Sequence, residues 1–330
     1  MKALVIGTGS IGRRHINNLI KLGIKVSAYS YRRSELIKFE NNQQINRQCN
    51  LDYALKEECD FIVICNSTEK HIEVAIEAAK LLKNLYIEKP ISNSLNKVDE
   101  LITISDTNNL LVDSGFVLRS HPNLNWISQF LRSNSLGEFI YASATAGQLL
   151  SDWRHNGDYR KSYSAFKSKG GGAIFDLIHE LDIIYWLFGK VNEVSCMTQK
   201  FRPLDIESES VAQMLIKLET GQTAHVRVDY VRPNYSRKLE LIFEKGILYW
   251  DYLKGEVLIE KRNKKPFLVN SIPENFNRND IFVNHMKSFL NKINAPYSHK
   301  NSTLKDGYEV LKIALASHES ALKKRSITIC

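Results

Sequence analysis

Three side chains that could move a proton lie close together in the middle of the chain. Asp176, His179 and Asp182 follow one another at intervals of three residues, just after three consecutive glycines at 170–172. On a helix predicted over 173–188, this spacing places neighbouring pairs on adjacent turns of one face. A carboxylate could then fix the imidazole tautomer while the other ring nitrogen exchanges a proton with a substrate. The alternative is a histidine that only bonds to its acidic neighbours, and the spacing leaves both open.

A second group of residues is suited to binding a dinucleotide. The apolar segment 2–6 runs into Gly7-Thr8-Gly9-Ser10-Ile11-Gly12, and a helical pattern follows. Gly7 permits a tight turn, Gly9 lets the backbone approach a pyrophosphate, and Gly12 lets the helix lie close to the strand. The first N–H groups of the helix can bind phosphate. The predicted cofactor-binding residues here are Gly7, Gly9, Ser10, Ile11 and Gly12, and the alternative is a merely structural glycine turn.

The residues after the second predicted strand, 24–30, indicate which dinucleotide to expect. An NAD site usually carries an acid about 20 residues after the glycines, where it binds the ribose 2′-hydroxyl. At this point the chain has Ser30, Arg32 and Arg33 and no acid. Guanidinium and hydroxyl groups suit a 2′-phosphate, so the sequence favours NADP over NAD. In the alternative, the arginines are a solvated pair on which adenine stacks.

Length and composition indicate a two-domain globular enzyme. The chain has 330 residues, more than one core usually supports, and 43% of them are hydrophobic. No apolar run reaches the ~18 residues of a membrane helix, and no signal peptide is recognisable. We therefore expect a cytoplasmic protein with no membrane partner.

Charge and cysteine content argue against a nucleic-acid-binding protein and against a protein held by disulfides or a metal site. The formal net charge is +9, but the basic residues are dispersed apart from a cluster at 261–265 that is typical of a solvated hairpin tip. We therefore expect no nucleic-acid partner, although the positive field would favour anionic ligands. The five cysteines stand apart without metal-binding spacing, so neither disulfides nor a metal site is predicted.

Alternating strands and helices are predicted for residues 1–122. The alternation is typical of an α/β Rossmann domain with a doubly wound parallel sheet, in which ligands bind at the carboxyl ends of the strands. This topology places Asn66, Ser67, Thr68, Glu88 and Lys89 at the cofactor. His71 joins them, although a helix-terminus role is its simpler interpretation. The expected strands are 2–6, 24–30, 60–65, 85–88 and 110–117, with helices at 11–22, 70–83 and 94–106.

After residue 122 the alternation stops and strand patterns dominate. Short glycine-containing turns between them predict antiparallel pairs. Residues 123–330 are therefore expected to form an α+β domain with a large, mostly antiparallel sheet, serving substrate binding and oligomerisation. The expected strands are 138–148, 192–202, 209–219, 222–231, 237–244 and 247–251, and the helices are 173–188, 279–293 and 304–323.

Taken together, these motifs resemble the Gfo/Idh/MocA oxidoreductases. The glycine turn, Glu88-Lys89-Pro90 and the Asp176…His179…Asp182 segment stand in the order of that family. Further similarities are residues 66–71, 118–122 and 306–320. Many members separate the Asp and the His by three residues, whereas here only Leu177 and Ile178 intervene. The resemblance implies hydride transfer between NAD(P) and a CH–OH group, a cis Lys89–Pro90 bond, and a homodimer or homotetramer.

Segments 148–154, 158–165 and 229–233 resemble the branch of this family linked to surface-polysaccharide and sialic-acid-like sugar synthesis. Their hydroxyl, amide, aromatic and arginine side chains suit a sugar with an anionic part. The alternative is a surface loop that its aromatic residues merely anchor. The substrate-binding residues implied by the resemblance are Arg119, Gln148, Trp153, Arg154, Tyr159, Arg160 and Tyr163.

The expected chemistry is exchange between an alcohol and a ketone. Hydride leaves carbon only if the hydroxyl proton is removed as the carbonyl forms. We expect His179 to be the general acid/base, oriented by Asp176 or Asp182, while Lys89, paired with Glu88, stabilises the developing negative oxygen. Two alternatives remain: a redox-cycling sugar lyase or hydrolase with tightly bound cofactor, and a non-enzymatic dinucleotide-sensing subunit.

Overall fold

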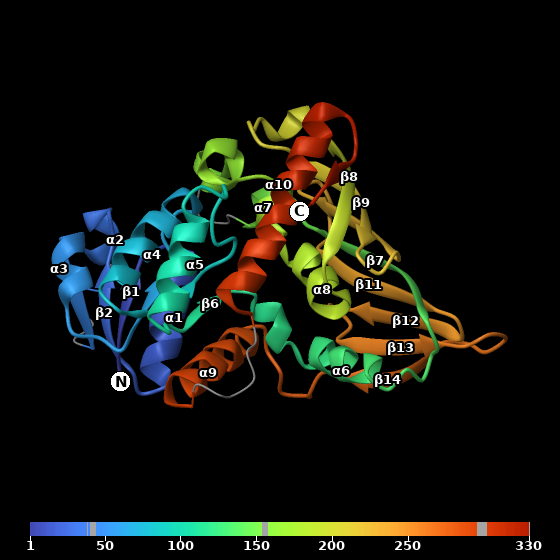
Figure 1. Cartoon of the computed structure of the whole chain (residues 1–330), viewed down its shortest axis with the longest axis horizontal. Helices are drawn as coiled ribbons and strands as arrows, with labels where there is room; N and C mark the ends of the chain where they lie inside the picture. Colours follow the sequence, from blue (N-terminus) through green and yellow to red (C-terminus); the bar gives the residue numbers. More distant parts are fainter. Residues whose placement is uncertain (38, 40–43, 154–157, 296–301, 330) are drawn as a thin grey trace. The chain divides into compact units, whose positions relative to one another are not determined.

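The computed structural model describes residues 1–37, 39, 44–153, 158–295 and 302–329, and the chain forms two compact units. The first unit comprises Met1–Val117 and Arg278–Leu311, and the second comprises Leu118–Asn277 and Lys312–Cys330. Each unit is built around one sheet (Figure 1). Helix α10 (Leu304–Lys323) contributes its first residues to one unit and the remainder to the other.

The first unit contains a six-stranded sheet in the order β3-β2-β1-β4-β5-β6, with every neighbouring pair parallel. This is the strand order of dinucleotide-binding domains, so the predicted Rossmann fold is confirmed. The sequence pattern missed β3, because only its first residue is apolar. The strands are β1 (Lys2–Ile6), β2 (Lys25–Tyr29), β3 (Ile45–Gln48), β4 (Phe61–Ile64), β5 (Asn84–Ile87) and β6 (Val112–Ser114).

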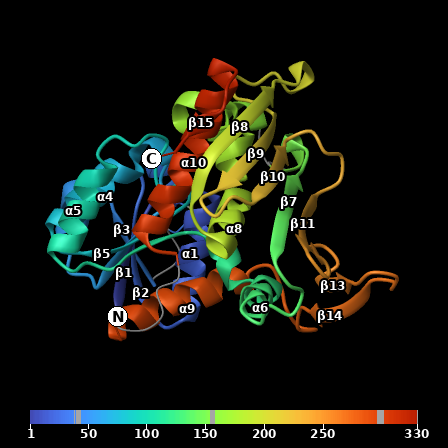
Figure 2. The same ribbon diagram turned by 45° about the vertical axis from the view of Figure 1, so that its right-hand side comes forward.

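Helices cover both faces of this sheet (Figure 2). Ile16 of α1 and Met286 and Phe289 of α9 belong to one buried cluster with Val5 of β1. The sequence assigned residues 279–293 to the second domain, but this apolar face packs α9 on the first sheet. The helices of the unit are α1 (Ser10–Lys21), α2 (Arg33–Ile37), α3 (Leu51–Lys56), α4 (His71–Lys80), α5 (Val98–Thr107) and α9 (Asp280–Asn294), with the 3-10 turn η1 (Thr68–Lys70).

The second unit contains a nine-stranded sheet in the order β14-β13-β12-β11-β7-β10-β9-β8-β15. All neighbours are antiparallel except β7 and β10, which confirms the mostly antiparallel sheet. The basic cluster 261–265 is exposed and joins β13 to β14, as a hairpin tip would. The strands are β7 (Phe139–Gly147), β8 (Val191–Gln199), β9 (Val211–Leu218), β10 (Thr223–Asp229), β11 (Ser236–Phe243), β12 (Gly246–Asp251), β13 (Glu256–Glu260), β14 (Phe267–Ser271) and β15 (Ile327–Thr328).

The prediction of a single helix over 173–188 is wrong. The structure has α7 (Ala173–Asp176) and α8 (His179–Phe188), separated at Leu177, whose ψ of 31° leaves the helical region. The last residue of α8, Phe188, stacks on Phe139 of β7 with ring centres 3.9 Å apart, so the helix lies against the second sheet (Figure 2). The unit also contains α6 (Pro122–Leu131) and the 3-10 turns η2 (Val117–Ser120), η3 (Leu150–Trp153), η4 (Tyr159–Lys161), η5 (Tyr163–Ala165), η6 (Lys167–Lys169) and η7 (Arg202–Leu204).

Within the described residues, no helix has both the length and the apolar character needed to cross a membrane.

Candidate functional site

The first part of the candidate site is the turn between β1 and α1. A Cβ at Gly12 would lie 1.9 Å from the carbonyl oxygen of Gly7, so Gly12 allows the helix to approach the strand. Gly7 has a φ of +95°, and a Cβ there would meet the backbone of Asn66. A Cβ at Gly9 would meet nothing within 4 Å of the described atoms. Gly9 is also the N-cap of α1 and brings no side chain to it, so the helix N-terminus faces open space that fits a phosphate.

Two shielded polar side chains at the same edge of the sheet fit a bound dinucleotide. Thr8 follows β1, and Asn66 follows the neighbouring strand β4. Within the part of the chain that the structure describes, Thr8 Oγ1 and both polar atoms of the Asn66 amide are buried without a hydrogen-bond partner. Buried polar groups are normally paired, and the hydroxyls, amide and phosphates of a dinucleotide would supply the partners. Ser67 and Thr68 come next, at the start of η1.

The end of β2 presents the residues predicted to select NADP. Ser30 Oγ accepts a hydrogen bond from the backbone N–H of Arg32 at 3.3 Å, and the Arg32 side chain is exposed. The side chain of Arg33 lies outside the described residues. Tyr31 is 48% exposed, and Nζ of Lys70 lies 4.5 Å from its ring centre. Sequence reasoning missed this additional cation because Lys70 belongs to η1, far from β2 in the chain.

Glu88, Lys89 and Pro90 follow β5, and the Lys89–Pro90 bond is cis, as the resemblance implied. Glu88 Oε2 accepts a hydrogen bond from the backbone N–H of Lys89 at 3.1 Å. His71 is buried, with Nδ1 2.9 Å from the carbonyl oxygen of Pro90 and Nε2 3.1 Å from that of Asn66. Burial lowers the pKa of His71. His71 therefore ties the segment after β4 to the segment after β5.

The second part of the candidate site begins at the three glycines before α7. Gly172 has a φ of +119°, and a Cβ there would lie 2.3 Å from Glu209 Oε1. The same carboxyl oxygen accepts the backbone N–H of Ile174 at 3.1 Å. Burial raises the pKa of Glu209 to about 7. Glu209 had no motif to mark it, and the glycine before α7 makes room for its carboxyl group.

Asp176 ends α7 as a buried carboxylate held by two hydroxyl groups. Its Oδ2 accepts hydrogen bonds from Ser164 Oγ at 2.6 Å and from the Tyr230 hydroxyl at 2.7 Å. Burial, reinforced by Asp176, raises the pKa of Tyr230 well above its ordinary value, so the phenol remains a donor. His179 begins α8 on the other side of the helix break. The sequence predicted that Asp176 and His179 share one face of a continuous helix, and this prediction is wrong because the two residues belong to different helices.

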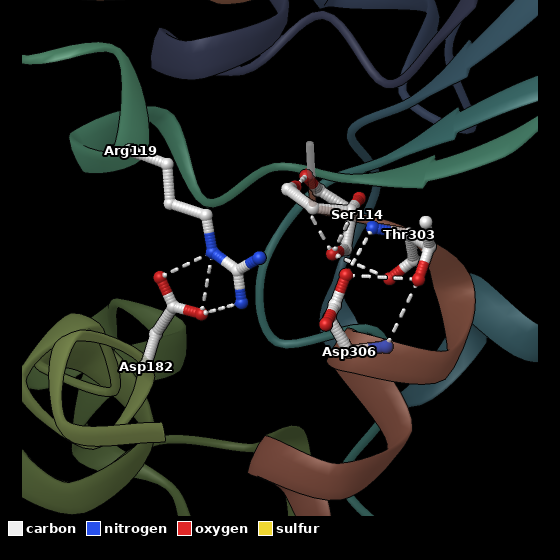
Figure 3. Close-up of polar contacts among 6 residues, drawn as sticks. Ser114, Arg119, Asp182, Thr303 and Asp306 are labelled. Atoms are coloured by element: carbon white, nitrogen blue, oxygen red, sulfur yellow. Dashed lines mark hydrogen bonds and ion pairs between the residues drawn. The ribbon is translucent and has the colours of Figure 1, made fainter. Parts of the chain in front are cut away.

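Asp182 and Arg119 form a buried ion pair (Figure 3). Arg119 Nε and Nη2 donate to Asp182 Oδ1 at 3.0 and 2.6 Å, and the two side chains are 3% and 0% exposed. The sequence assigned Arg119 to the substrate and Asp182 to the imidazole, whereas the structure joins them to each other. Glu180, also on α8, is bonded by Arg237 Nε of β11 at 2.7 Å. The helix that carries His179 thus holds two buried acids, each bonded to an arginine.

Among the predicted sugar-binding residues, Trp153 lies beside the Asp176–Tyr230 pair. Its ring is nearly perpendicular to that of Tyr230, with the centres 5.3 Å apart. The indole N–H of Trp153 is buried and has no partner among the described residues. Tyr163 is 38% exposed and immediately precedes Ser164, which bonds to Asp176. Both aromatic residues lie in the loop that follows β7, and each neighbours a residue that bonds to Asp176.

The remaining predicted sugar-binding residues are Gln148, Arg154, Tyr159 and Arg160. Arg160 is exposed, and its Nε donates to Asp158 at 2.9 Å. Tyr159 is half-buried at the start of η4, and Gln148 donates its backbone N–H to the carbonyl oxygen of Asp229. Arg154 lies outside the described residues. Within the described ranges, no group of three or more His, Cys, Asp or Glu side chains could hold a metal ion.

Two family profiles match most of the chain. Residues 1–116 match the oxidoreductase family with an NAD-binding Rossmann fold, and residues 125–249 match the GFO/IDH/MocA C-terminal domain.

Individual relatives are distant in sequence. Myo-inositol 2-dehydrogenase of Thermotoga maritima is 22% identical, with 100% of this chain and 98% of that protein covered. The 2,7-anhydro-N-acetylneuraminate hydratase of Mediterraneibacter gnavus is 25% identical over 48% of this chain and 43% of its own length. The solved structure of levoglucosan dehydrogenase with NADH and L-sorbose has a TM-score of 0.89 at 17% identity, covering 100% of this chain and 99% of that one. At that identity, the structural likeness shows the fold.

The six-stranded sheet, the glycine turn with its open helix N-terminus and the two profiles agree with one another. This chain is therefore an oxidoreductase of the Gfo/Idh/MocA family, with an NAD-binding Rossmann domain at its N-terminus.

Proposed function

We propose that the chain is a cytoplasmic dehydrogenase or reductase that prefers NADP(H), acts on a hydroxyl or keto carbon of a sugar, and serves surface-glycan synthesis. The observation that carries this proposal is that Lys89 lies two residues after β5 in a dinucleotide-binding unit, while His179 begins α8 in the second unit. The names of the relatives, which refer to myo-inositol, levoglucosan and an anhydro-sialic acid, support a sugar or polyol substrate.

In the proposed reaction, bound NAD(P) supplies the hydride acceptor or donor. Lys89 donates a hydrogen bond to the substrate oxygen and stabilises negative charge on it. His179 takes the hydroxyl proton as general base and returns it in the reverse direction. Asp176, fixed by Ser164 and Tyr230, provides a stationary acceptor three residues before the acid/base. We propose that residues 1–122 serve the cofactor and residues 123–330 the substrate.

We propose that the sugar lies against Trp153 and Tyr163. The buried indole N–H of Trp153 has no partner within the described residues, so a sugar hydroxyl would satisfy it. Gln148 and Tyr159 come from the same loop and are proposed to bind further hydroxyl groups. The bonds of Arg119 to Asp182 and of Arg160 to Asp158 leave the aromatic residues as the main support for a sugar site.

The turnover experiment uses NADPH and NADH with free and nucleotide-linked sugars. The probes are myo-inositol, levoglucosan, UDP-N-acetylglucosamine and 2,7-anhydro-N-acetylneuraminate, and nicotinamide absorbance is followed with each. In Lys89→Ala, kcat should fall by about 100-fold or more, because one donor to the developing oxyanion is lost. In His179→Ala, the loss should be about 100-fold or more, through the missing general base. Normal kcat in Lys89→Ala would contradict the proposal.

The NADP preference rests on Arg32, Lys70 and the Ser30 hydroxyl at the end of β2. Arg32→Ala should weaken NADPH binding about tenfold, measured by fluorescence titration, and leave NADH binding unchanged, because only NADPH carries the 2′-phosphate. Lys80→Ala is the matched control, since this exposed lysine pairs with Glu77 on α4. Tighter binding of NADH than of NADPH by the unmodified protein would overturn the preference.

A second candidate function is redox cycling without net oxidation, which the likeness to a hydratase favours. In that case the sugar product would accumulate while nicotinamide absorbance returns to its starting value. Product analysis by mass spectrometry distinguishes the two functions, because a dehydrogenase consumes one cofactor for each product formed.

We also propose that the chain forms a homodimer or homotetramer through the outer face of the second sheet. Tyr141 of β7, Met197 of β8 and Leu215 of β9 lie on one face and are 41%, 80% and 63% exposed. Large apolar side chains that are exposed on one face of a sheet mark interaction surfaces. Leu215→Asp should lower the mass measured by light scattering, whereas Leu253→Asp, at an exposed position outside this face, should not. A monomeric unmodified protein would contradict the proposal.

A further inference from the structure

We propose that His15 is a positioning residue for the reaction: it holds Glu88, Glu88 holds the backbone of Lys89, and the lysine is thereby coupled to α1, the helix that would bind the cofactor. The proposal rests on the role given to Lys89 under the proposed function. His15 lies in α1, three residues after Gly12, and belongs to none of the motifs that mark the site.

The contacts run through one carboxyl group. His15 Nε2 lies 2.7 Å from Glu88 Oε1, and Glu88 Oε2 accepts the backbone N–H of Lys89 at 3.1 Å. The backbone N–H of Glu88 bonds to the carbonyl oxygen of Ile64 at 2.9 Å. The two carboxyl oxygens thus join α1 to the main chain of Lys89, and β4 fixes the position from which the carboxyl group extends.

The surroundings leave Glu88 little freedom. His15 is 0% exposed and Glu88 is 6% exposed. The imidazole lies edge-on to Tyr86 with ring centres 5.2 Å apart, and Phe282 lies 6.2 Å away. A Cβ at Gly115 would lie 2.9 Å from Glu88 Oε2, so the missing side chain there makes room for the carboxyl group. These neighbours hold the imidazole and the carboxyl group in contact.

The cost of burial argues for a functional role. An acid placed at this depth must be hydrogen-bonded, and a buried polar pair is seldom more stabilising than apolar side chains of the same volume. The pair is therefore better explained by what it fixes than by stability. It connects α1, which would bind the phosphate, to the backbone of the proposed catalytic lysine. These two segments must be in register for hydride transfer.

Two substitutions separate hydrogen bonding from packing. In His15→Gln, the side-chain amide can place a donor near the position of the imidazole Nε2. In His15→Met, the side chain has similar length and no donor. Glu88→Gln is a second test of the same link, because its amide has one acceptor where the carboxylate has two, and the contacts of His15 and Lys89 require both.

The first readout needs no substrate. Limiting acetic anhydride labels lysines, and peptide mass spectrometry gives the rate at Lys89 relative to exposed Lys80. In His15→Met, the Glu88 carboxyl group loses the contact that holds it, and the backbone of Lys89 loses its fixed acceptor, so the relative rate should change about threefold or more. Glu88→Gln should also change the rate, because its single carbonyl oxygen can accept from His15 or from the Lys89 backbone but not from both. His15→Gln should keep the rate of the unmodified protein.

The second readout is a split between kcat and KM. With the sugar probe that the unmodified protein turns over fastest, His15→Met should lower kcat about tenfold while KM and NADPH affinity stay within about threefold. His15→Gln should restore most of kcat. Folding is checked by circular dichroism, and Glu88→Gln replaces His15→Met if the latter does not fold.

Unchanged Lys89 labelling together with unchanged kcat in folded His15→Met would overturn the proposal. So would equal losses in His15→Gln and His15→Met, because packing alone would then explain the effect. Normal kcat in Lys89→Ala would contradict the proposed function instead, and the labelling rates would still decide whether His15 controls the Lys89 backbone.

Discussion

At the scale of single residues, the Arg119–Asp182 pair shows that a buried charge is stabilised by a bonded group of opposite charge. Asp182→Asn removes the carboxylate that pairs with the buried guanidinium of Arg119, so the free energy of unfolding should fall by about 3–5 kcal/mol. Urea unfolding measures the change. The matched control is Asp158→Asn, which removes the exposed partner of Arg160 and should leave the unfolding free energy unchanged. Unchanged stability of Asp182→Asn with a raised substrate KM would show that Arg119 serves the substrate instead.

Single residues also show which contacts can be predicted from the sequence and which cannot. The spacing of Gly7 and Gly12 predicted a packing requirement that the structure confirms, because that requirement is local to one turn. The partner of Arg119 could not be predicted, since Asp182 is distant in sequence and only the fold brings the two together. Glu209 and His15 belong to no motif, because their roles arise from burial beside other segments. The proposed catalytic and binding roles remain predictions.

At the scale of elements, the β1–α1 turn separates a folding requirement from a binding requirement. Gly9→Ala places its methyl group in open space, so the melting temperature should change by less than about 2 °C. NADPH affinity should nevertheless fall about tenfold, since the methyl group occupies the approach to the pyrophosphate. Gly12→Ala should instead destabilise the protein, because its Cβ would meet the carbonyl oxygen of Gly7. Fluorescence titration and thermal melts make the comparison, and undiminished NADPH binding by Gly9→Ala would contradict it.

The start of α7 gives a pH dependence. Burial raises the pKa of Glu209 from 4.5 to about 7, so between these values the folded state keeps a proton that the unfolded state releases. Its contribution to stability is therefore full below about pH 4.5 and is lost as the pH rises to about 7. Between pH 5 and 7.5, the unmodified protein should lose on the order of 1–3 kcal/mol relative to Glu209→Gln. Guanidinium unfolding at both values measures this, and a pH-independent difference between the two proteins would contradict it.

Elements with a clear apolar period were the ones that the sequence predicted well. In β9, Ala212, Met214 and Ile216 alternate with exposed neighbours, and this strand was found. The break between α7 and α8 was missed, because apolar residues continue through Leu177 and Ile178 and both are buried in the structure. Periodicity reports which residues are buried, whereas the backbone path there depends on the bonds to Glu209 and Asp176.

At the scale of the whole molecule, one parallel sheet and one mostly antiparallel sheet followed from the sequence. The alternation of strands and helices predicted the parallel sheet, and the short turns predicted the antiparallel one. The boundaries of the compact units could not be predicted from the sequence, because α9 packs on the first sheet although it follows the strands of the second sheet in the chain. Its amphipathic pattern predicts a buried face, but no local signal states which sheet that face covers.

The central claim is that this family member transfers hydride between a nicotinamide dinucleotide and a sugar with the help of Lys89. The most direct test is to titrate NADPH and NADH into the unmodified protein and into Lys89→Ala, and then to follow nicotinamide absorbance with the four sugar probes. The account predicts that both proteins bind NADPH with similar affinity and that only the unmodified protein shows substantial turnover. Failure of the unmodified protein to bind either dinucleotide, or equal turnover by Lys89→Ala, would contradict it.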